Sequence, residues 1–429
     1  MKINVYNLLS YIYFTLILCM SFLGIKMSIW VFAAFFVISI PYIFNKIEHL
    51  LAIITLTSTI AYFFVGADEG IFSLYTIFAV VALVNTFVKK RTVFNGDFKV
   101  LFISILICLI AFISYNQSPF SYLKGFFGFV YVVLISIIVG NIAKFDYRVF
   151  FDILVKFSCI MTLFYFTMIP FTGVFFDGKL RIYPTVNSNT FGMSSAQLAV
   201  ILFWGLFFSS SKGVYKIAKT ISFLISLVLV LLSGSRSSLF AMVAAIFVMI
   251  LFLSLKKEFI GIKAKRILCS LLFVAMVGVF VVWATQIDIS RYNYIELIED
   301  GGTNRNAIYA AVIPYILSKG YWRWGYGPGH ECSRIVVTSL MNRGYTHTHN
   351  TFIEVFGELG VGGLILLIFF IIFAIKTTLK ESKKVPERLA FLGLLLCLMI
   401  NGMAEAYLCD IYLWILISLC TKVTHKAVS

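Results

Sequence analysis

The chain has 429 residues, of which 61% are hydrophobic and only 13% charged, whereas about a quarter of the residues in an average soluble domain are charged. This composition excludes an ordinary soluble globular protein and indicates a polytopic membrane protein. The net charge of +16 does not require a nucleic-acid partner, because basic loops of a membrane protein face anionic membrane lipids.

Apolar stretches long enough to cross a bilayer, which takes about 20 residues of helix, recur between short polar breaks along almost the whole chain. They predict an all-α fold with about fourteen transmembrane helices, and very short breaks between some neighbours leave the count between about 12 and 14. The stretches lie near residues 8–25, 28–44, 50–66, 71–88, 100–115, 125–142, 153–175, 191–210, 217–234, 238–254, 267–285, 351–375, 389–406 and 408–421.

Three regions follow from this pattern: a first bundle of spans over residues 1–285, a polar segment over 286–350, and the last spans over 351–429. Lysine and arginine collect in cytoplasmic loops of membrane proteins. Most basic residues fall in the breaks that share a side with the N-terminus. We therefore expect both termini to be cytoplasmic and the polar segment to be a large loop on the outer side of the membrane that contains short helices.

Two arginines lie at predicted span ends on the outer side. Arg181 stands in "DGKLRIYPTVNSNTFG", close in sequence to Asn189, and Arg236 stands in "LLSGSRSSLF" between two spans. A charge so near the hydrocarbon is costly unless it faces a cavity or a partner. Because guanidinium matches phosphate oxygens in bidentate geometry, we expect these arginines to bind an anionic group. The alternative is that each anchors to a lipid phosphate.

The polar segment 286–350 is long enough that a function is expected of it. An apolar stripe within it predicts a short amphipathic helix that ends near Gly320. Arg305 falls in the first turn of this helix, where the helix dipole disfavours a cation unless an anion binds there. The run "WGYGPG" that follows is typical of an interfacial turn whose glycines let a bulky ligand approach the backbone.

The stretch "GYTHTHNTFIEVFGELGVGG", residues 344–363, places His347 and His349 just before an apolar helix. An imidazole accepts a proton at ordinary pH, so His349 is a candidate general base. A polar residue that only caps the helix is the alternative, and a metal site built on the two histidines lacks a convincing third ligand. If the span begins near His349, three residues share one face and would line a polar cavity: Asn350, Glu354 and Glu358.

Three of these stretches resemble recurring elements of the O-antigen ligase and Wzy O-antigen polymerase superfamily. They are "LSGSRSSL", "WGYGPG" and "HNTFIEVFGELGVGG", in which an arginine follows a serine, a Gly-aromatic-Gly turn ends the large periplasmic loop, and a His-Asn pair opens the next span. "NSNTFG" is similar to a further element, although Ser188 stands where the family has proline. The resemblance covers roughly residues 180–405.

The resemblance implies a GT-C-like glycosyltransferase of the bacterial inner membrane, without cofactor or metal. Its donor is an oligosaccharide linked through pyrophosphate to undecaprenol, and glycosyl transfer on the periplasmic face inverts the anomeric carbon. His349 takes the proton of the acceptor hydroxyl. The resemblance further implies that the pyrophosphate is held by Arg181, Arg236 and Arg305. Further candidates for substrate binding are Asn189, His347, Asn350 and Glu354.

Three functions remain open. The leading prediction is a polymerase that joins lipid-linked O-antigen repeat units, with a Wzz-type chain-length regulator as a candidate partner. The first alternative is a ligase that transfers the finished polysaccharide to lipid A-core. The span count and the Phe-, Ile- and Lys-rich composition favour the polymerase. The second alternative is a polysaccharide or lipid transporter, which would be expected to show internal repeats that the sequence lacks.

Overall fold

A computed structural model describes residues 5–22, 29–43, 47–57, 74–88, 98–120, 123–142, 146–176, 179–182, 188–207, 213–254, 305–341, 348–408 and 411–422. Within these residues the chain is helical apart from one two-stranded hairpin. It divides into two compact units, each assembled from three separate segments of the chain.

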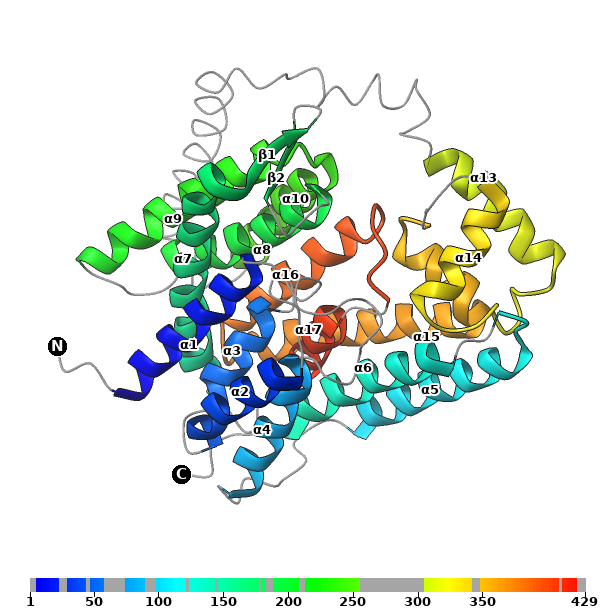
Figure 1. The fold of residues 1–429 in the computed structure, drawn as a ribbon, viewed down its shortest axis with the longest axis horizontal. Helices are drawn as coiled ribbons and strands as arrows, with labels where there is room; N and C mark the ends of the chain where they lie inside the picture. The colour runs from blue at the N-terminus through cyan, green and yellow to red at the C-terminus, as the bar shows by residue number, and fades with distance from the viewer. Residues whose placement is uncertain are drawn as a thin grey trace. The chain divides into compact units, whose positions relative to one another are not determined.

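Unit 1 comprises residues 1–91, 145–291 and 382–398. In it α8 packs against α7, α9 and α10, and α3 packs against α7 (Figure 1). Its elements are α1 (Val5–Phe22), α2 (Ile29–Ser39), the 3-10 helix η1 (Ile40–Ile43), α3 (Ile47–Thr57), α4 (Leu74–Val88), α7 (Tyr147–Thr172), β1 (Gly173–Phe176), β2 (Lys179–Ile182), α8 (Ser188–Phe207), α9 (Val214–Leu232), α10 (Arg236–Ser254) and most of α16 (Arg388–Asn401).

The hairpin is a departure from the predicted all-α fold. Strands β1 and β2 follow α7 directly and pair antiparallel, with Val174 opposite Arg181. The two strands are only four residues each. Periodicity cannot identify strands this short next to a long apolar run, which explains why the sequence predicted a span end and not a strand at Arg181.

Unit 2 comprises residues 92–144, 292–381 and 399–429. In it α15 packs against α5 and α17, and α17 packs against α6. Trp414 of α17 is fully buried and its ring contacts those of Phe129 and Phe370. Its elements are α5 (Phe98–Gln117), α6 (Leu123–Ile142), α13 (Arg305–Ser318), α14 (His330–Met341), α15 (Thr351–Glu381), the last turn of α16 and α17 (Ile411–Thr421).

Each predicted apolar stretch contains a described helix, except the one near 267–285, which lies outside the described residues. Among the described helices, four are long and apolar enough to cross a membrane: α5, α7, α9 and α15. The other apolar helices are shorter in their described parts. The fold is therefore that of a helical integral membrane protein, and the count of about fourteen spans stays a prediction.

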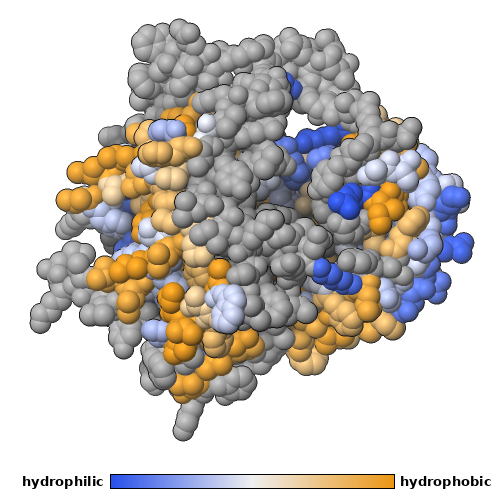
Figure 2. All heavy atoms as spheres, viewed as in Figure 1, coloured by the Kyte–Doolittle hydropathy of each residue, from blue (hydrophilic) through white to orange (hydrophobic). Residues whose placement is uncertain are grey.

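Apolar side chains also lie on the outside of the helices. On α5, one face at helical spacing carries the exposed side chains of Phe98, Phe102, Ile105, Leu109 and Phe112. Soluble proteins rarely expose such a continuous apolar stripe. In Figure 2, hydrophobic atoms cover the surface over α5, α6 and α9, whereas hydrophilic atoms gather over α13 and α14. This distribution fits spans in lipid and short helices in water.

The predicted amphipathic helix is confirmed as α13. Its buried face consists of Ile308, Val312 and Ile316, and Gly320 follows it with φ +76°, as is common just past a helix end. The buried face packs against α14, which contributes Cys332, Val336 and Val337 to the same small core. This core gives α13 and α14 a fixed position within unit 2.

Candidate functional site

His349 lies just before α15 in an unusual backbone conformation. Its φ of +48° makes it the one non-glycine residue with positive φ among those described. Histidine is one of the few residue types enriched in this left-handed region, and such strain tends to be kept at functional sites. The Tyr309 hydroxyl donates to the His349 carbonyl oxygen at 3.3 Å, which links this backbone to α13.

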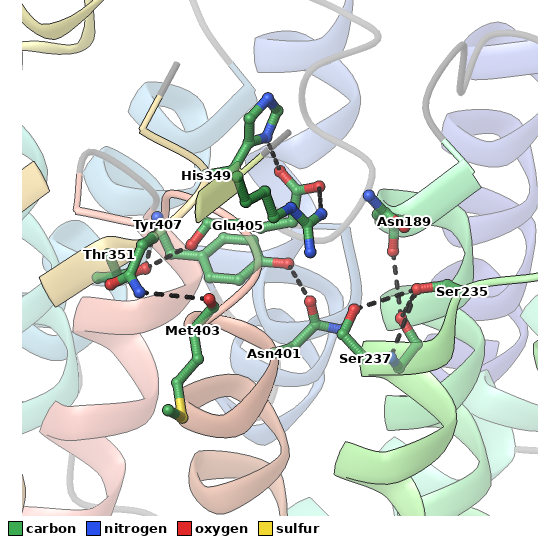
Figure 3. Close-up of polar contacts among 12 residues, drawn as sticks. Asn189, Ser235, Ser237, His349, Thr351, Asn401, Met403, Glu405 and Tyr407 are labelled. Atoms are coloured by element: carbon green, nitrogen blue, oxygen red, sulfur yellow. Dashed lines mark hydrogen bonds and ion pairs between the residues drawn. The ribbon is translucent and has the colours of Figure 1, made fainter. Parts of the chain in front are cut away.

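Glu405 joins the side chains of His349 and Arg305, and Figure 3 shows its contact with His349. Its Oε2 lies 3.4 Å from His349 Nδ1, and its Oε1 lies 3.8 Å from Arg305 Nη2. The Glu405 side chain is 11% exposed, whereas those of His349 and Arg305 are 29% and 27% exposed. The carboxylate therefore lies deeper than the two groups that it contacts.

This geometry prepares the imidazole for proton transfer. A carboxylate that accepts the Nδ1 proton fixes the ring orientation and the tautomer, and it stabilises the imidazolium that forms when the ring takes up a second proton. The other ring nitrogen, Nε2, is turned away from Glu405 (Figure 3). A ring held in this way can accept a proton at Nε2.

Arg305 is the first residue of α13, as the apolar stripe predicted. Its guanidinium meets Glu405 at the end of the helix where backbone N–H groups point outward. Both the helix end and the guanidinium favour an anion. At 3.8 Å and partly exposed, the ion pair with Glu405 is a weak one. Arg305 is therefore available to an anion that competes with Glu405 for the guanidinium.

Two residues at the start of α15 form hydrogen bonds with the turn that carries Glu405. The Thr351 hydroxyl donates to the Glu405 carbonyl oxygen at 2.9 Å and accepts from the Tyr407 amide at 3.0 Å. Asn350 Oδ1 accepts from the Phe352 amide at 2.9 Å, which caps α15, and Asn350 Nδ2 donates to the Met403 carbonyl at 3.3 Å. Asn350, a candidate substrate ligand by sequence, thus holds the site together in this structure.

Tyr309 completes the cluster as a proton donor. Burial raises the pKa of Tyr309 above its ordinary value near 10, and this effect outweighs the lowering by the Asn350 side chain and by the positive charge of Arg305. The phenol therefore stays protonated at neutral pH. Its hydroxyl therefore remains a donor for the hydrogen bond to the His349 carbonyl.

Glu354 and Glu358 lie in the protein interior, at 1% and 0% exposure. Glu358 Oε2 accepts the Gly329 amide at 2.8 Å, so the loop after α13 covers this face of α15. The backbone of the predicted "WGYGPG" turn is closely approached by α15 and not by a ligand. A Cβ at Gly325 would collide with the Glu358 carbonyl. The expectation that these glycines admit a ligand is therefore wrong for this arrangement.

Unit 1 brings Asn189 and the turn around Arg236 together. The Ser238 hydroxyl donates to the Asn189 carbonyl at 3.4 Å, and a Cβ on Gly192 would lie only 2.6 Å from Ser233 Oγ. Gly234, with φ +62°, turns the chain between α9 and α10. Arg236 is therefore the first residue of a helix, as Arg305 is in unit 2, and its side chain is half-buried.

The remaining sequence candidates are Arg181 and His347. Arg181 lies in β2, which contacts α8 in the same unit as Arg236. His347 lies outside the described residues. Within the described residues, no group of three or more His, Cys, Asp or Glu side chains is arranged to hold a metal ion.

Glu405 is the site residue that sequence reasoning missed. Glu405 and Asp410 both lie in "AEAYLCD" between two apolar stretches, where the sequence alone predicts solvated loop charges. Glu405 is 56 positions from His349 in the chain, so the sequence alone does not indicate that the two side chains are in contact. The available signal was its location next to the last pair of predicted spans, at the end where His349 was also expected.

Residues 221–368 match the protein-family model Wzy_C, described as O-antigen ligase. The match covers about a third of the chain and includes Arg236, Arg305 and His349. Arg181, Asn189 and Glu405 lie outside it. No curated protein matches the chain.

Proposed function

Because residues 221–368 match the Wzy_C O-antigen ligase family model, we propose that the protein polymerises undecaprenyl-pyrophosphate-linked O-antigen repeat units. Members of this family are glycosyl-transferring enzymes that act on lipid-linked glycans. The observation that carries the proposal is the cluster of His349, Glu405 and Arg305, since it combines a base, its orienting carboxylate and a phosphate-binding cation.

In the proposed reaction, His349 Nε2 removes the proton from an acceptor sugar hydroxyl as that oxygen attacks the anomeric carbon of the donor. The new bond forms opposite the leaving group, so the anomeric configuration inverts. The bond between the anomeric carbon and the pyrophosphate oxygen breaks, and undecaprenyl pyrophosphate leaves with the electron pair. The imidazolium then returns its proton to water.

Arg305 contributes to this step by stabilising the charge that grows on the leaving pyrophosphate. Fixed cations and helix N-termini are suited to this task because they need no reorganisation during the reaction. By family resemblance, Arg181 and Arg236 are also pyrophosphate-binding residues, and Asn189 lies next to the Arg236 turn in unit 1. Glu405 contacts His349 on the nitrogen that does not meet the substrate.

The proposed membrane arrangement has about fourteen spans in a GT-C-like fold. Both termini lie on the cytoplasmic side, and residues 286–350 lie in the periplasm of a bacterial inner membrane. The helices found at nearly all predicted positions support the span count. A Wzz-type chain-length regulator is a candidate partner.

The ligase is the second candidate, and the description of the matching family model as O-antigen ligase favours it. A ligase would use the same donor, and the same base and arginines would serve it. The two activities differ in the acceptor, which is a lipid-linked repeat unit for the polymerase and lipid A-core for the ligase.

The test uses purified full-length protein in lipid nanodiscs with a synthetic undecaprenyl-pyrophosphoryl oligosaccharide. The polymerase converts this substrate alone into a ladder of longer chains, without nucleotide or added divalent cation. Transfer that occurs only after lipid A-core is added would establish the ligase instead. If the protein merely moves the lipid across vesicles without forming a glycosidic bond, it is a transporter and the enzyme proposal is wrong.

A further inference from the structure

The loop between α13 and α14 inserts into the hydrogen-bond ladder of α15. In a continuous α-helix, the Val361 amide would donate to the Gly357 carbonyl four residues earlier. Here the Val361 amide donates to the Trp322 carbonyl at 2.8 Å, and the Gly357 carbonyl accepts the Tyr326 amide at 2.8 Å. Gly360, with φ +68°, makes the break. The loop thus replaces one backbone hydrogen bond of α15 with two hydrogen bonds of its own, which fix its position along the helix.

Beyond the break, α15 presents an apolar face to its surroundings. The exposed side chains recur at helical spacing and are followed on the same face by exposed Lys376 and Lys380. From Val361 to Lys380 the helix is about 29 Å long, close to the roughly 30 Å of a hydrocarbon core. The apolar part of this stripe consists of Val361, Ile365, Ile368, Phe369 and Ile372.

The inserted loop lies at the end of this stripe opposite the lysines. Its residues are of the types found at the boundary between water and lipid. Trp322 and Trp324 are 38% and 49% exposed, and tryptophan is enriched where headgroups meet acyl chains. Arg323 is exposed and lies over the Trp322 ring, 5.2 Å from its centroid. Lys319 is exposed as well. Two cations beside two indoles fit anionic phosphate above an apolar layer.

We propose that residues 319–324 are a membrane-docking surface, which seats the Trp322 and Trp324 rings at the bilayer boundary and pairs Lys319 and Arg323 with lipid phosphate. The continuity of the loop with the exposed stripe of α15 favours lipid over a glycan as its occupant, although indole rings would also stack on sugars. This inference is independent of the proposed reaction.

Docking fixes the height of the candidate site. From Gly360 back to Thr351, α15 extends about 13 Å beyond the boundary, and His349 and Glu405 lie at that end. The cluster then stands at the level of the headgroups or just above them.

The test measures tryptophan fluorescence of the full-length protein in nanodiscs whose lipids carry bromine either near the headgroup or near the acyl terminus. The emission that is lost in the Trp324→Phe or Trp322→Phe variant reports on that indole. We expect this emission to be quenched strongly by shallow bromines, weakly by deep bromines and weakly by aqueous iodide. Trp414→Phe is the matched control, because Trp414 is buried and fully enclosed by protein.

Two results would overturn the proposal. Strong iodide quenching without bromine quenching would place the loop in water. Protection of the two indoles by soluble repeat-unit oligosaccharide in lipid-free detergent, without bromine quenching in nanodiscs, would identify a glycan-binding surface. Both measurements read fluorescence and not turnover, so they are unaffected if the polymerase assignment fails.

Discussion

Glu405 Oε2 lies 3.4 Å from Nδ1 of His349, although the two residues are 56 positions apart in the chain. The turn that carries Glu405 is clasped by Thr351, the second residue after His349. One short segment therefore holds both the imidazole and the carboxylate that orients it.

The first prediction concerns this carboxylate. Glu405→Gln keeps the side-chain size and the backbone clasp but removes the negative charge, so kcat should fall by about 10- to 100-fold while KM for the lipid-linked donor changes little. Glu405→Asp should recover part of the loss. Equal effects on kcat and KM, or equal activity of the two variants, would contradict an orienting role.

The second prediction concerns the base itself. His349→Ala should lower the rate of chain growth by about 100- to 10,000-fold, the range that general-base groups contribute. His425→Ala, near the C-terminus, is a matched control and should retain full activity. Both variants must reach the membrane in equal amounts, as judged by immunoblot. Normal ladders from His349→Ala would end its assignment as the base.

The third prediction tests the geometry at Arg305. Arg305→Lys keeps the charge but loses the planar fork that matches two phosphate oxygens, so it should be impaired, and Arg305→Ala should be impaired more. The measurement is the initial rate at several donor concentrations. Arg334→Ala on α14 removes one positive charge elsewhere in the same unit and should have a much smaller effect. A similar loss in both alanine variants would indicate a general charge effect.

Some elements of the fold and of the candidate site could be predicted from the sequence and others could not. Apolar runs predicted the helix positions, because hydropathy alone decides which segments enter a bilayer. Arg305 was placed correctly at the start of α13, because the stripe from Ile308 to Ile316 has helical spacing. Long-range pairing was not predictable, since neither the Glu405–His349 contact nor the insertion at Gly360 leaves a local periodic pattern.

The fourth prediction concerns the break in α15. Gly360→Ala should lower the free energy of unfolding by about 1–3 kcal/mol, because φ is +68° and a Cβ would lie 2.7 Å from the Arg323 carbonyl oxygen. Gly128→Ala in α6, where a Cβ meets no atom within 4 Å, should leave the protein unchanged or slightly more stable. Thermal unfolding in detergent measures both. Equal behaviour of the two variants would show that the break is not required.

The fifth prediction separates hydrogen bonding from charge at Glu358. Glu358→Gln retains an oxygen that accepts the Gly329 amide and should cost little stability. Glu358→Leu leaves that buried amide unpaired, which should cost about 1–3 kcal/mol. The same unfolding assay compares the two. A large loss with glutamine would mean that the negative charge itself is required.

The backbone hydrogen bonds between α15 and the loop that precedes it also constrain the order in which the chain folds during synthesis. Residues 319–329 leave the ribosome before α15 does, yet their backbone partners, at Gly357 and Val361, lie on that later helix. Until α15 has been translated and inserted into the membrane, the loop between α13 and α14 lacks these hydrogen-bond partners. A nascent chain that stops short of residue 361 should therefore be readily cut by protease in this loop, and completing the helix should make it resistant.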